Sequence, residues 1–187
     1  EYTLANVVVV GAQFGDEGKA KVTDLLAHNA DIVVRYQGGA NAGHTVVVDK
    51  ETYKFHLIPS GILYPGKICV LGPGMVIDPK AFISEVKGLT DRGLDDSRIK
   101  VSASAHVTMP YHLALDAAEE ASRGENKIGT TKRGIGPTYA DKCARSGIRM
   151  EDLLDREVLK EKLNWMVPRK NVLLERMYNH PPFDAAE

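Results

Sequence analysis

Three segments of the sequence combine glycine with charged or hydroxyl side chains, a combination that suits anion binding. The first, residues 11–21, reads Gly-Ala-Gln-Phe-Gly-Asp-Glu-Gly-Lys-Ala-Lys. Its glycines let backbone N–H groups approach an anion, a helix N-terminus favours negative charge, and its lysines add positive charge. Gln13 breaks both the P-loop and the dinucleotide-binding spacing, and Ala20 replaces the magnesium-binding hydroxyl of a P-loop. The segment fits either phosphate binding or a glycine-rich turn between a strand and a helix.

Two carboxylates, Asp16 and Glu17, lie inside this first segment. They would repel a polyphosphate unless one of them bound a metal ion or a proton. Magnesium prefers carboxylate and phosphate oxygens, so a metal ion beside Asp16 is chemically sensible. A solvated acidic pair at a helix N-terminus, which the helix dipole favours, is the alternative.

The second segment, residues 37–45, reads Gln-Gly-Gly-Ala-Asn-Ala-Gly-His-Thr and contains a single histidine. The neighbours of His44 are small or polar, so we expect its ring to be exposed in a loop. A reference pKa of about 6.5 lets a histidine give or take a proton near neutral pH. A purely structural histidine is the alternative.

The third segment, residues 128–137, reads Ile-Gly-Thr-Thr-Lys-Arg-Gly-Ile-Gly-Pro, and Ala144-Arg145 follows it. Hydroxyls, cations and glycines together suit an anionic ligand, because arginine can bind phosphate through two hydrogen bonds. A polar surface loop is the alternative. The remaining histidines show no metal-ligand spacing and receive no role: His28, His56, His106, His112 and His180.

The elements that must position these segments alternate between strands and helices. Four consecutive valines at residues 7–10 predict a strand buried on both faces, and residues 31–35 and 68–71 predict further buried strands. Residues 98–103 alternate weakly like a strand. The first two glycine-rich segments each follow a strand, so they should emerge at the same sheet edge. The pattern predicts an α/β fold, a P-loop-like and mostly parallel sheet flanked by helices.

Helices are predicted between and after these strands. One begins near Val22, and Asp78-Pro79 marks the N-cap and first residue of another. The apolar face of the second helix carries Phe82, Ile83, Val86 and Leu89. Residues 110–123 form a third helical pattern. Residues 150–178 carry an apolar stripe that should pack on a body or a partner, with a break at Pro168.

Composition excludes several classes of protein. The 187 residues include 24 basic and 25 acidic side chains, and a net charge of −1 argues against bulk-charge binding to nucleic acid or membrane. No apolar run approaches the roughly 20 residues that a membrane helix needs. The two cysteines form no Cys-x-x-Cys pair, which favours free thiols in a reducing compartment. We therefore expect a soluble, cytoplasmic protein without nucleic-acid or membrane partners.

The three segments, in this order, resemble the adenylosuccinate synthetase family. Its members carry Gly-Asp-Glu-Gly-Lys after the first strand, here residues 15–19, and Arg-Tyr-Gln-Gly-Gly-x-Asn-Ala-Gly-His-Thr, here residues 35–45. Three further stretches fit as well: His-Leu-Ile-Pro-Ser-Gly at 56–61, Gly-Thr-Thr-x-Arg-Gly-Ile-Gly-Pro at 129–137, and Ala144-Arg145. Motifs of this length are a specific signal, and the resemblance covers most of the chain.

The resemblance implies a reaction. The family joins IMP and L-aspartate into adenylosuccinate with GTP as phosphoryl donor, the first committed step from IMP to AMP. An aspartate removes the N1 proton of IMP, O6 attacks the γ-phosphate while a histidine acts as acid, and the amine of aspartate displaces the phosphate. By this resemblance Asp16 is the base and His44 the acid, and the Asp16 carboxylate and the Gly43 carbonyl bind Mg²⁺.

The resemblance also implies two overlapping nucleotide sites. The GTP phosphates would be bound by Gly15, Asp16, Glu17, Gly18, Lys19, Ala20, Lys21, Gly43, His44 and Thr45. IMP would be contacted by Asp16, Glu17, Gly18, Lys19, Asn41, Ala42, Gly43, His44, Thr131 and Arg145. Arg145 would reach the IMP phosphate of a partner subunit, because the family works as a homodimer.

The sequence departs from the family in three respects. Ala20 stands where glycine is usual, and Phe14 replaces a common tryptophan. Family members are more than twice as long, so the fold should be incomplete relative to the family and the chain alone inactive. Residues 1–149 are then the N-terminal part of the α/β nucleotide-binding domain, and residues 150–187 a truncated helical segment.

Two other functions stay open. A different phosphate-transferring GTPase or kinase would hydrolyse or transfer phosphate without IMP. A non-catalytic remnant would bind a partner through residues 150–178, regardless of nucleotide. The presence of both Asp16 and His44 favours the enzyme, because a drifting remnant need not keep the pair.

Overall fold

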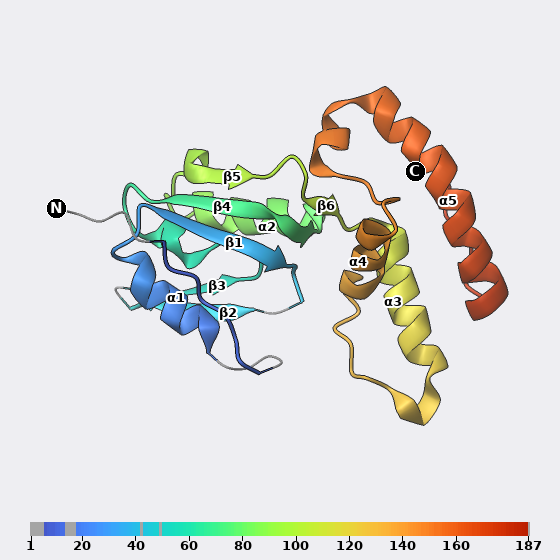
Figure 1. Cartoon of the computed structure of the whole chain (residues 1–187), viewed down its shortest axis with the longest axis horizontal. Helices are drawn as coiled ribbons and strands as arrows, with labels where there is room; N and C mark the ends of the chain where they lie inside the picture. The colour runs from blue at the N-terminus through green and yellow to red at the C-terminus, as the bar shows by residue number, and fades with distance from the viewer. Residues whose placement is uncertain (1–5, 14–17, 42, 49, 187) are drawn as a thin grey trace.

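The structure is a computed structural model. It describes residues 6–13, 18–41, 43–48 and 50–186. A sheet, a hairpin and the first helices form one part of it, and three helices gather at the other end of its long axis (Figure 1). Within the described ranges, no helix combines the length and the apolar character needed to cross a bilayer.

The sheet is parallel, with the strand order β1–β4–β5. Its strands are β1 (Ile32–Gly38), β4 (Ile68–Ile77) and β5 (Ile99–Val101), and β6 (His106–Val107) pairs with the last two residues of β4. The register places Val33 opposite Cys69 and Cys69 opposite Ile99. This arrangement confirms the predicted α/β class, and it confirms the strands expected near residues 31, 68 and 98.

The described residues also contain a β-hairpin and five α-helices. The hairpin is formed by β2 (His44–Val48) and β3 (Glu51–Phe55). The helices are α1 (Lys19–Ala27), α2 (Pro79–Thr90), α3 (Pro110–Ser122), α4 (Ile135–Cys143) and α5 (Arg156–Tyr178). Short 3₁₀ turns are η1 (Ser60–Leu63), η2 (Asp96–Arg98), η3 (Gly124–Asn126) and η4 (Met150–Leu154).

One face of the sheet carries the core. Val33 and Cys69 point into a cluster with the buried Ala27 of α1, Phe55 of β3 and Leu89 of α2. A second cluster continues along β4, beyond Cys69, with Leu71, Met75 and Ile77. Side chains alternate across a strand, so Val34 points to the other face, where it is 50% exposed. The predicted burial of both faces of these strands is therefore wrong for β1.

The valines of residues 7–10 do not form the predicted strand. Val7, Val8 and Val10 are 68%, 71% and 69% exposed. A β-branched run becomes a buried strand only where a neighbouring strand satisfies its backbone hydrogen bonds. None of the described strands pairs with residues 6–10. The apolar side of α1 is uncovered in the same way, since Leu25 is 75% exposed.

Helix α2 begins where its sequence predicts. The Asp78 carboxylate accepts hydrogen bonds from the backbone N–H groups of Lys80 and Ala81, and Pro79 occupies the first helical position. Gly93 adopts a left-handed φ of 79° just past the end of the helix. These local signals suffice because caps and glycine ends act within a few residues.

Helix α5 runs through Pro168, so the predicted break there is wrong. Proline removes one N–H group and crowds the preceding turn, which normally kinks or ends a helix. Here the residues before and after it, Met166, Val167 and Leu174, are buried against Tyr111 and Leu115 of α3. This packing keeps the helix continuous.

Candidate functional site

The second and third glycine-rich segments meet beside the carboxyl ends of β1 and β4. The hydroxyl of Tyr139 in α4 accepts a hydrogen bond from the Gly38 N–H at 2.8 Å and donates one to the Gly74 carbonyl at 2.8 Å. One side chain thus joins the end of β1, strand β4 and the helix that follows the third segment. Ligands bind at this edge in parallel α/β sheets.

Gly39 lies at the closest point of this junction. A Cβ atom at Gly39 would lie 2.6 Å from Cδ1 of Ile135 and 2.8 Å from the carbonyl oxygen of Val76. Both distances are shorter than a van der Waals contact. The second segment therefore needs glycine here for packing, whatever ligand it binds.

His44 is the first residue of β2 and not part of an exposed loop. Its register partner across the hairpin is Phe55, and the two rings stack with centroids 5.3 Å apart. Cross-strand neighbours bring side chains into contact, and this is how a ring with small sequence neighbours becomes half-buried. The expectation of an exposed histidine is wrong.

The surroundings of His44 favour its neutral form. Burial lowers its pKa, and the positive charge of Arg35 and the nearby His56 lower it further, while Asp24 raises it. Asp24 belongs to α1, so this interaction also places the helix of the first segment next to His44. The imidazole is therefore held close to groups from α1 and β1.

Arg35 connects the second segment to residue 56. Its guanidinium donates hydrogen bonds to the carbonyl oxygens of His56 and Gly39, the latter at 2.8 Å. A third hydrogen bond reaches the carbonyl of Gln37 at 3.4 Å. Arginine carries several donors in a fixed plane, which suits one side chain to hold several loop carbonyls.

Glu85 of α2 binds residues 56–58, the stretch whose first carbonyl is bound by Arg35. Its carboxylate accepts hydrogen bonds from the backbone N–H groups of His56, Leu57 and Ile58, with shortest distances of 3.2, 2.9 and 3.0 Å. A Cβ atom at Gly43 would lie 2.8 Å from Cε1 of His56. The backbone at Gly43 therefore lies against the ring of His56, a residue whose backbone is hydrogen-bonded by both Glu85 and Arg35.

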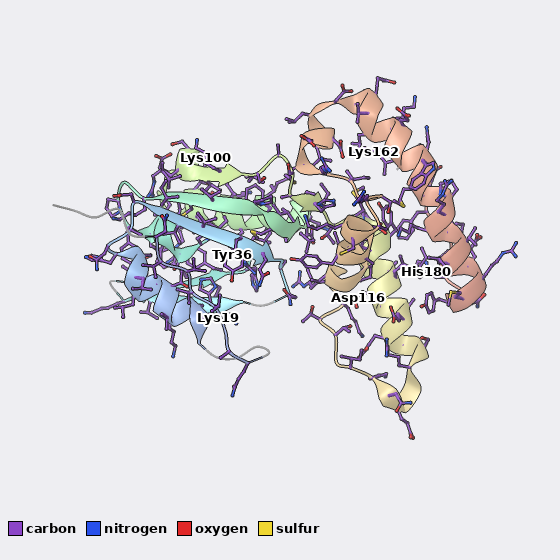
Figure 2. The ribbon with its side chains drawn as sticks, viewed as in Figure 1. Lys19, Tyr36, Lys100, Asp116, Lys162 and His180 are labelled. Carbon is purple, nitrogen blue, oxygen red and sulfur yellow. The ribbon has the colours of Figure 1, made fainter. Side chains whose placement is uncertain are left out.

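The N-terminus of α1 follows the first glycine-rich segment. Gly18 precedes the helix in a left-handed conformation, with φ of 80°, and no side chain caps it among the described residues. Lys19, Ala20 and Lys21 form the first turn, and Lys19 is labelled in Figure 2. The backbone N–H groups of a first helical turn and the positive end of the helix dipole are elements of a phosphate site.

The structure brings together only part of the predicted set. Gly15, Asp16, Glu17 and Ala42 lie outside the described residues. Asn41, Gly43, Thr45, Thr131 and Arg145 are exposed. Among the described residues, no hydrogen bond or ion pair joins Thr131 or Arg145 to α1 or to β2. Helix α1 and His44 therefore form one group, through Asp24, and Thr131 and Arg145 belong to the helical end of the molecule.

Two residues of this site, Glu85 and Tyr139, were not predicted from the sequence. Glu85 had a detectable signal, because it lies on the helix face that also carries Phe82, Val86 and Leu89. An acidic side chain on an apolar face must find buried donors. Tyr139 had none, since its partners are 65 and 101 residues away in the chain.

Fold and site together define an α/β protein with glycine-rich loops beside the carboxyl end of a parallel sheet, the edge where ligands bind in such folds. The family profile named adenylosuccinate synthetase matches residues 8–187. The chain belongs to the adenylosuccinate synthetase family.

Similar proteins agree with this assignment. Adenylosuccinate synthetase of Synechococcus elongatus is 60% identical over 182 residues, which are 97% of this chain and 41% of the relative. That of Acaryochloris marina is 61% identical over 98% of this chain and 41% of its own length. The chain thus spans less than half the length of the curated relatives it matches.

Two solved structures resemble the fold. The fully ligated adenylosuccinate synthetase of Plasmodium falciparum matches with a TM-score of 0.81 and 39% identity, over 94% of this chain and 41% of that chain. The succinoaminodeoxyadenylate synthetase of cyanophage S-2L, bound to dGMP and dATP, matches with a TM-score of 0.58 and 27% identity. That match covers 78% of this chain and 41% of the phage protein. The fold is therefore that of the family, and it is incomplete by length.

Proposed function

We propose that this chain supplies catalytic and phosphate-binding loops of an enzyme that joins IMP and L-aspartate to adenylosuccinate with GTP. The observation that carries the proposal is the 60% identity to a synthetase across 97% of the chain. The geometry supports it, because Asp24 of α1, the helix that follows the first glycine-rich segment, acts electrostatically on the half-buried His44. The chain spans 41% of that relative, so the activity belongs to the complete protein.

In this proposal Asp16 accepts the N1 proton of IMP, which makes O6 a nucleophile. A bond then forms between O6 and the γ-phosphorus of GTP, and the bond to the β-γ bridging oxygen breaks to release GDP. His44 donates a proton to the transferring group. The amine of aspartate finally attacks C6, and inorganic phosphate leaves. Asp16 lies outside the described residues, so its role rests on the resemblance.

His44 suits the role of an acid that is charged by its substrate. Burial and Arg35 lower its pKa and favour the neutral ring in the free chain. The negative charge of bound phosphates favours the protonated ring and would raise that pKa. His44 would then carry the proton when the GTP phosphates are bound.

The remaining contacts follow the same assignment. The GTP phosphates lie at the α1 N-terminus with Gly18, Lys19 and Lys21, and IMP contacts Asn41 and Thr131. In the homodimer, Arg145 reaches the IMP of the partner subunit. A cytoplasmic location completes the proposal, and the two free thiols, Cys69 and Cys143, fit a reducing compartment.

Magnesium belongs to the same proposal. No group of three His, Cys, Asp or Glu side chains among the described residues is placed to cage a metal ion. Magnesium is commonly held by one or two carboxylates, with substrate phosphates and water completing the octahedron. The Asp16 carboxylate and the Gly43 carbonyl would supply the protein ligands. The bound ion would neutralise phosphate charge.

The test is a full-length chimera in which this chain replaces the matching part of the Synechococcus elongatus synthetase. We expect adenylosuccinate formation that requires IMP, GTP and aspartate. Asp16→Asn and His44→Gln should each lower kcat by about 100-fold or more, the usual contribution of a general acid or base. His28→Gln, at the far end of α1, is the matched control and should leave kcat unchanged.

Two results would contradict the proposal. One is phosphate release from GTP without IMP, the behaviour of another GTPase or kinase. The other is equal activity of the His44→Gln and His28→Gln chimeras. The 187-residue chain alone should show no turnover in either case, because it spans 41% of the relative.

A further inference from the structure

Helix α3 carries three buried polar side chains on one face. His112, Asp116 and Glu120 are 0%, 9% and 4% exposed. They are spaced four residues apart, so they lie on one side of the helix, one turn after another. The chain after α3 turns back along the helix and leads into α4 (Figure 1), and Asp116 is labelled beside α4 in Figure 2.

Glu120 binds the start of the third glycine-rich segment. Its carboxylate accepts hydrogen bonds from the N–H groups of Ile128, Gly129 and Thr130 at 3.2, 2.6 and 3.3 Å. Gly129 adopts a left-handed φ of 82° within this turn. Three consecutive amides are thereby directed at a carboxylate of the protein itself.

Asp116 binds the end of the same segment. Its carboxylate accepts a hydrogen bond from the Gly134 N–H at 2.8 Å. Gly134 is the N-cap of α4, with φ of 70°, and a Cβ atom there would lie 2.8 Å from the carbonyl carbon of His112. The α4 N-terminus is thus seated on the backbone of α3, with the Asp116 charge at the positive end of its dipole.

His112 binds the far part of α4. Its Nδ1 accepts the Met109 N–H at 2.9 Å, so its Nε2 carries the proton and donates to the Asp141 carboxylate at 2.9 Å. The Asp141 carbonyl accepts hydrogen bonds from the N–H groups of Ser146 and Gly147. These bonds close the turn in which Arg145 adopts a left-handed conformation. The turn that carries Arg145 is therefore anchored to Asp141, which is itself held by His112 of α3.

Amides balance the two carboxylates of this face. Acids four residues apart repel each other on a helix. Burial alone would raise the pKa of Glu120, but the Gly129, Ile128 and Thr130 amides and nearby Arg123 hold it below its usual value. The amides of the segment that Glu120 binds therefore favour its ionised form.

We infer that His112, Asp116 and Glu120 form a template on α3 that sets the backbone around Thr131 and Arg145 for binding the purine nucleotide. They are positioning residues, since all three side chains are buried and bind groups of the chain itself. Thr131 lies between an amide held by Glu120 and an amide held by Asp116. This assignment rests on the proposed function for the identity of the nucleotide.

The template itself is tested by amide hydrogen exchange on the 187-residue chain. Glu120→Gln should speed exchange of the Ile128, Gly129 and Thr130 amides by about tenfold or more, because a neutral amide oxygen is a weaker acceptor. Asp116→Asn should speed exchange of Gly134 instead. Glu119→Gln is the matched control, an exposed carboxylate on the same helix. Unchanged rates in both template variants would overturn the inference.

The link to the nucleotide is tested in the full-length chimera. Glu120→Gln should raise KM for IMP by about tenfold, equivalent to about 1.4 kcal/mol, and leave KM for GTP unchanged. General destabilisation would not produce that difference between the two substrates. Faster exchange with an unchanged KM for IMP would overturn the positioning role. A parent chimera without ligase activity would refute the proposed function, while the exchange rates would still decide the template.

Discussion

At the scale of single residues, the site depends on close backbone approach as much as on charge. Gly39 lies where β4, α4 and the loop after β1 meet, and the carbonyl of Val76 leaves no room for a methyl group. His44 gains its properties from Phe55, Arg35 and Asp24, each from a different element. The chemistry of this histidine is therefore set by packing.

We predict that Gly39→Ala destabilises the chain by about 1–3 kcal/mol, because the new Cβ must displace Val76 or Ile135 in a packed region. Gly136→Ala is the matched control. It lies in α4 with nothing within 4 Å of its would-be Cβ, so alanine should be neutral or stabilising by up to about 1 kcal/mol. Urea unfolding measures both, and equal midpoints would contradict the packing seen here.

Some residues of the site can be predicted from the sequence and others cannot. The glycines, His44 and the lysines of α1 were recognisable, because the motif itself contains them. Glu85 and Glu120 accept hydrogen bonds from backbone amides of two motifs, 27 and 8 residues away, respectively, but neither glutamate lies within a motif. For Glu85 the sequence does carry a signal, its position on the apolar face of α2 with Phe82, Val86 and Leu89.

At the scale of elements, α4 is held between α3 and α5 by a buried charged group. Asp141 of α4 accepts hydrogen bonds from His112 of α3 and from Lys170 of α5. Tyr111, next to His112, packs its ring against that imidazole at 4.4 Å. The three helices are thereby joined by polar contacts as well as by the apolar cluster around Leu174.

This group makes stability depend on pH. Burial lowers the pKa of His112, Lys170 lowers it further, and Asp141 opposes the shift. The unfolded histidine binds a proton near its ordinary value of 6.5, and the folded one does so only at lower pH. The stability is therefore complete above about pH 6.5 and is lost as pH falls below it.

We predict that urea unfolding shows this loss as the pH falls below about 6.5. His112→Gln should make the dependence shallower, because one of the histidines responsible is gone. His44 and His106, whose pKa values are also lowered, supply the rest. An identical pH profile for the variant would refute the assignment to His112.

Element prediction succeeded where the signal was local and failed where it depended on distant partners. The Asp78 cap and the proline after it specify α2 within a few residues. The valines of residues 7–10 carry a strand signal, but a strand needs a neighbour that these described residues do not supply. Pro168 carries a breaking signal that packing against α3 overrides.

At the scale of the whole molecule, one side of the sheet is left uncovered. Strand β1 pairs only with β4 among the described strands, so its other edge is open. Ile32, Val34 and Tyr36 all lie on its exposed face. Open edges and exposed apolar faces favour association between copies.

We predict that the purified chain associates as its concentration rises, and that Val34→Thr weakens this association. Threonine keeps the β-branched shape and adds a polar group on the exposed face. Val33→Thr is the control, because Val33 is 6% exposed and points into the core. It should instead lower stability by about 1–3 kcal/mol. Sedimentation velocity and urea unfolding separate the two effects, and a monomeric chain at all concentrations would contradict the prediction.

The hydroxyl of Tyr139 has a consequence for the order of events during synthesis. It fixes a peptide 101 residues earlier in the chain. Chains emerge from the ribosome N-terminus first, and contacts between distant positions form late because closing a long loop costs entropy. Strands β1 and β4 can pair as soon as both have emerged. The loop after β1 reaches its final conformation only when α4 has been made and Tyr139 can bind Gly38. The newly made sheet therefore forms before the loops at its edge are fixed.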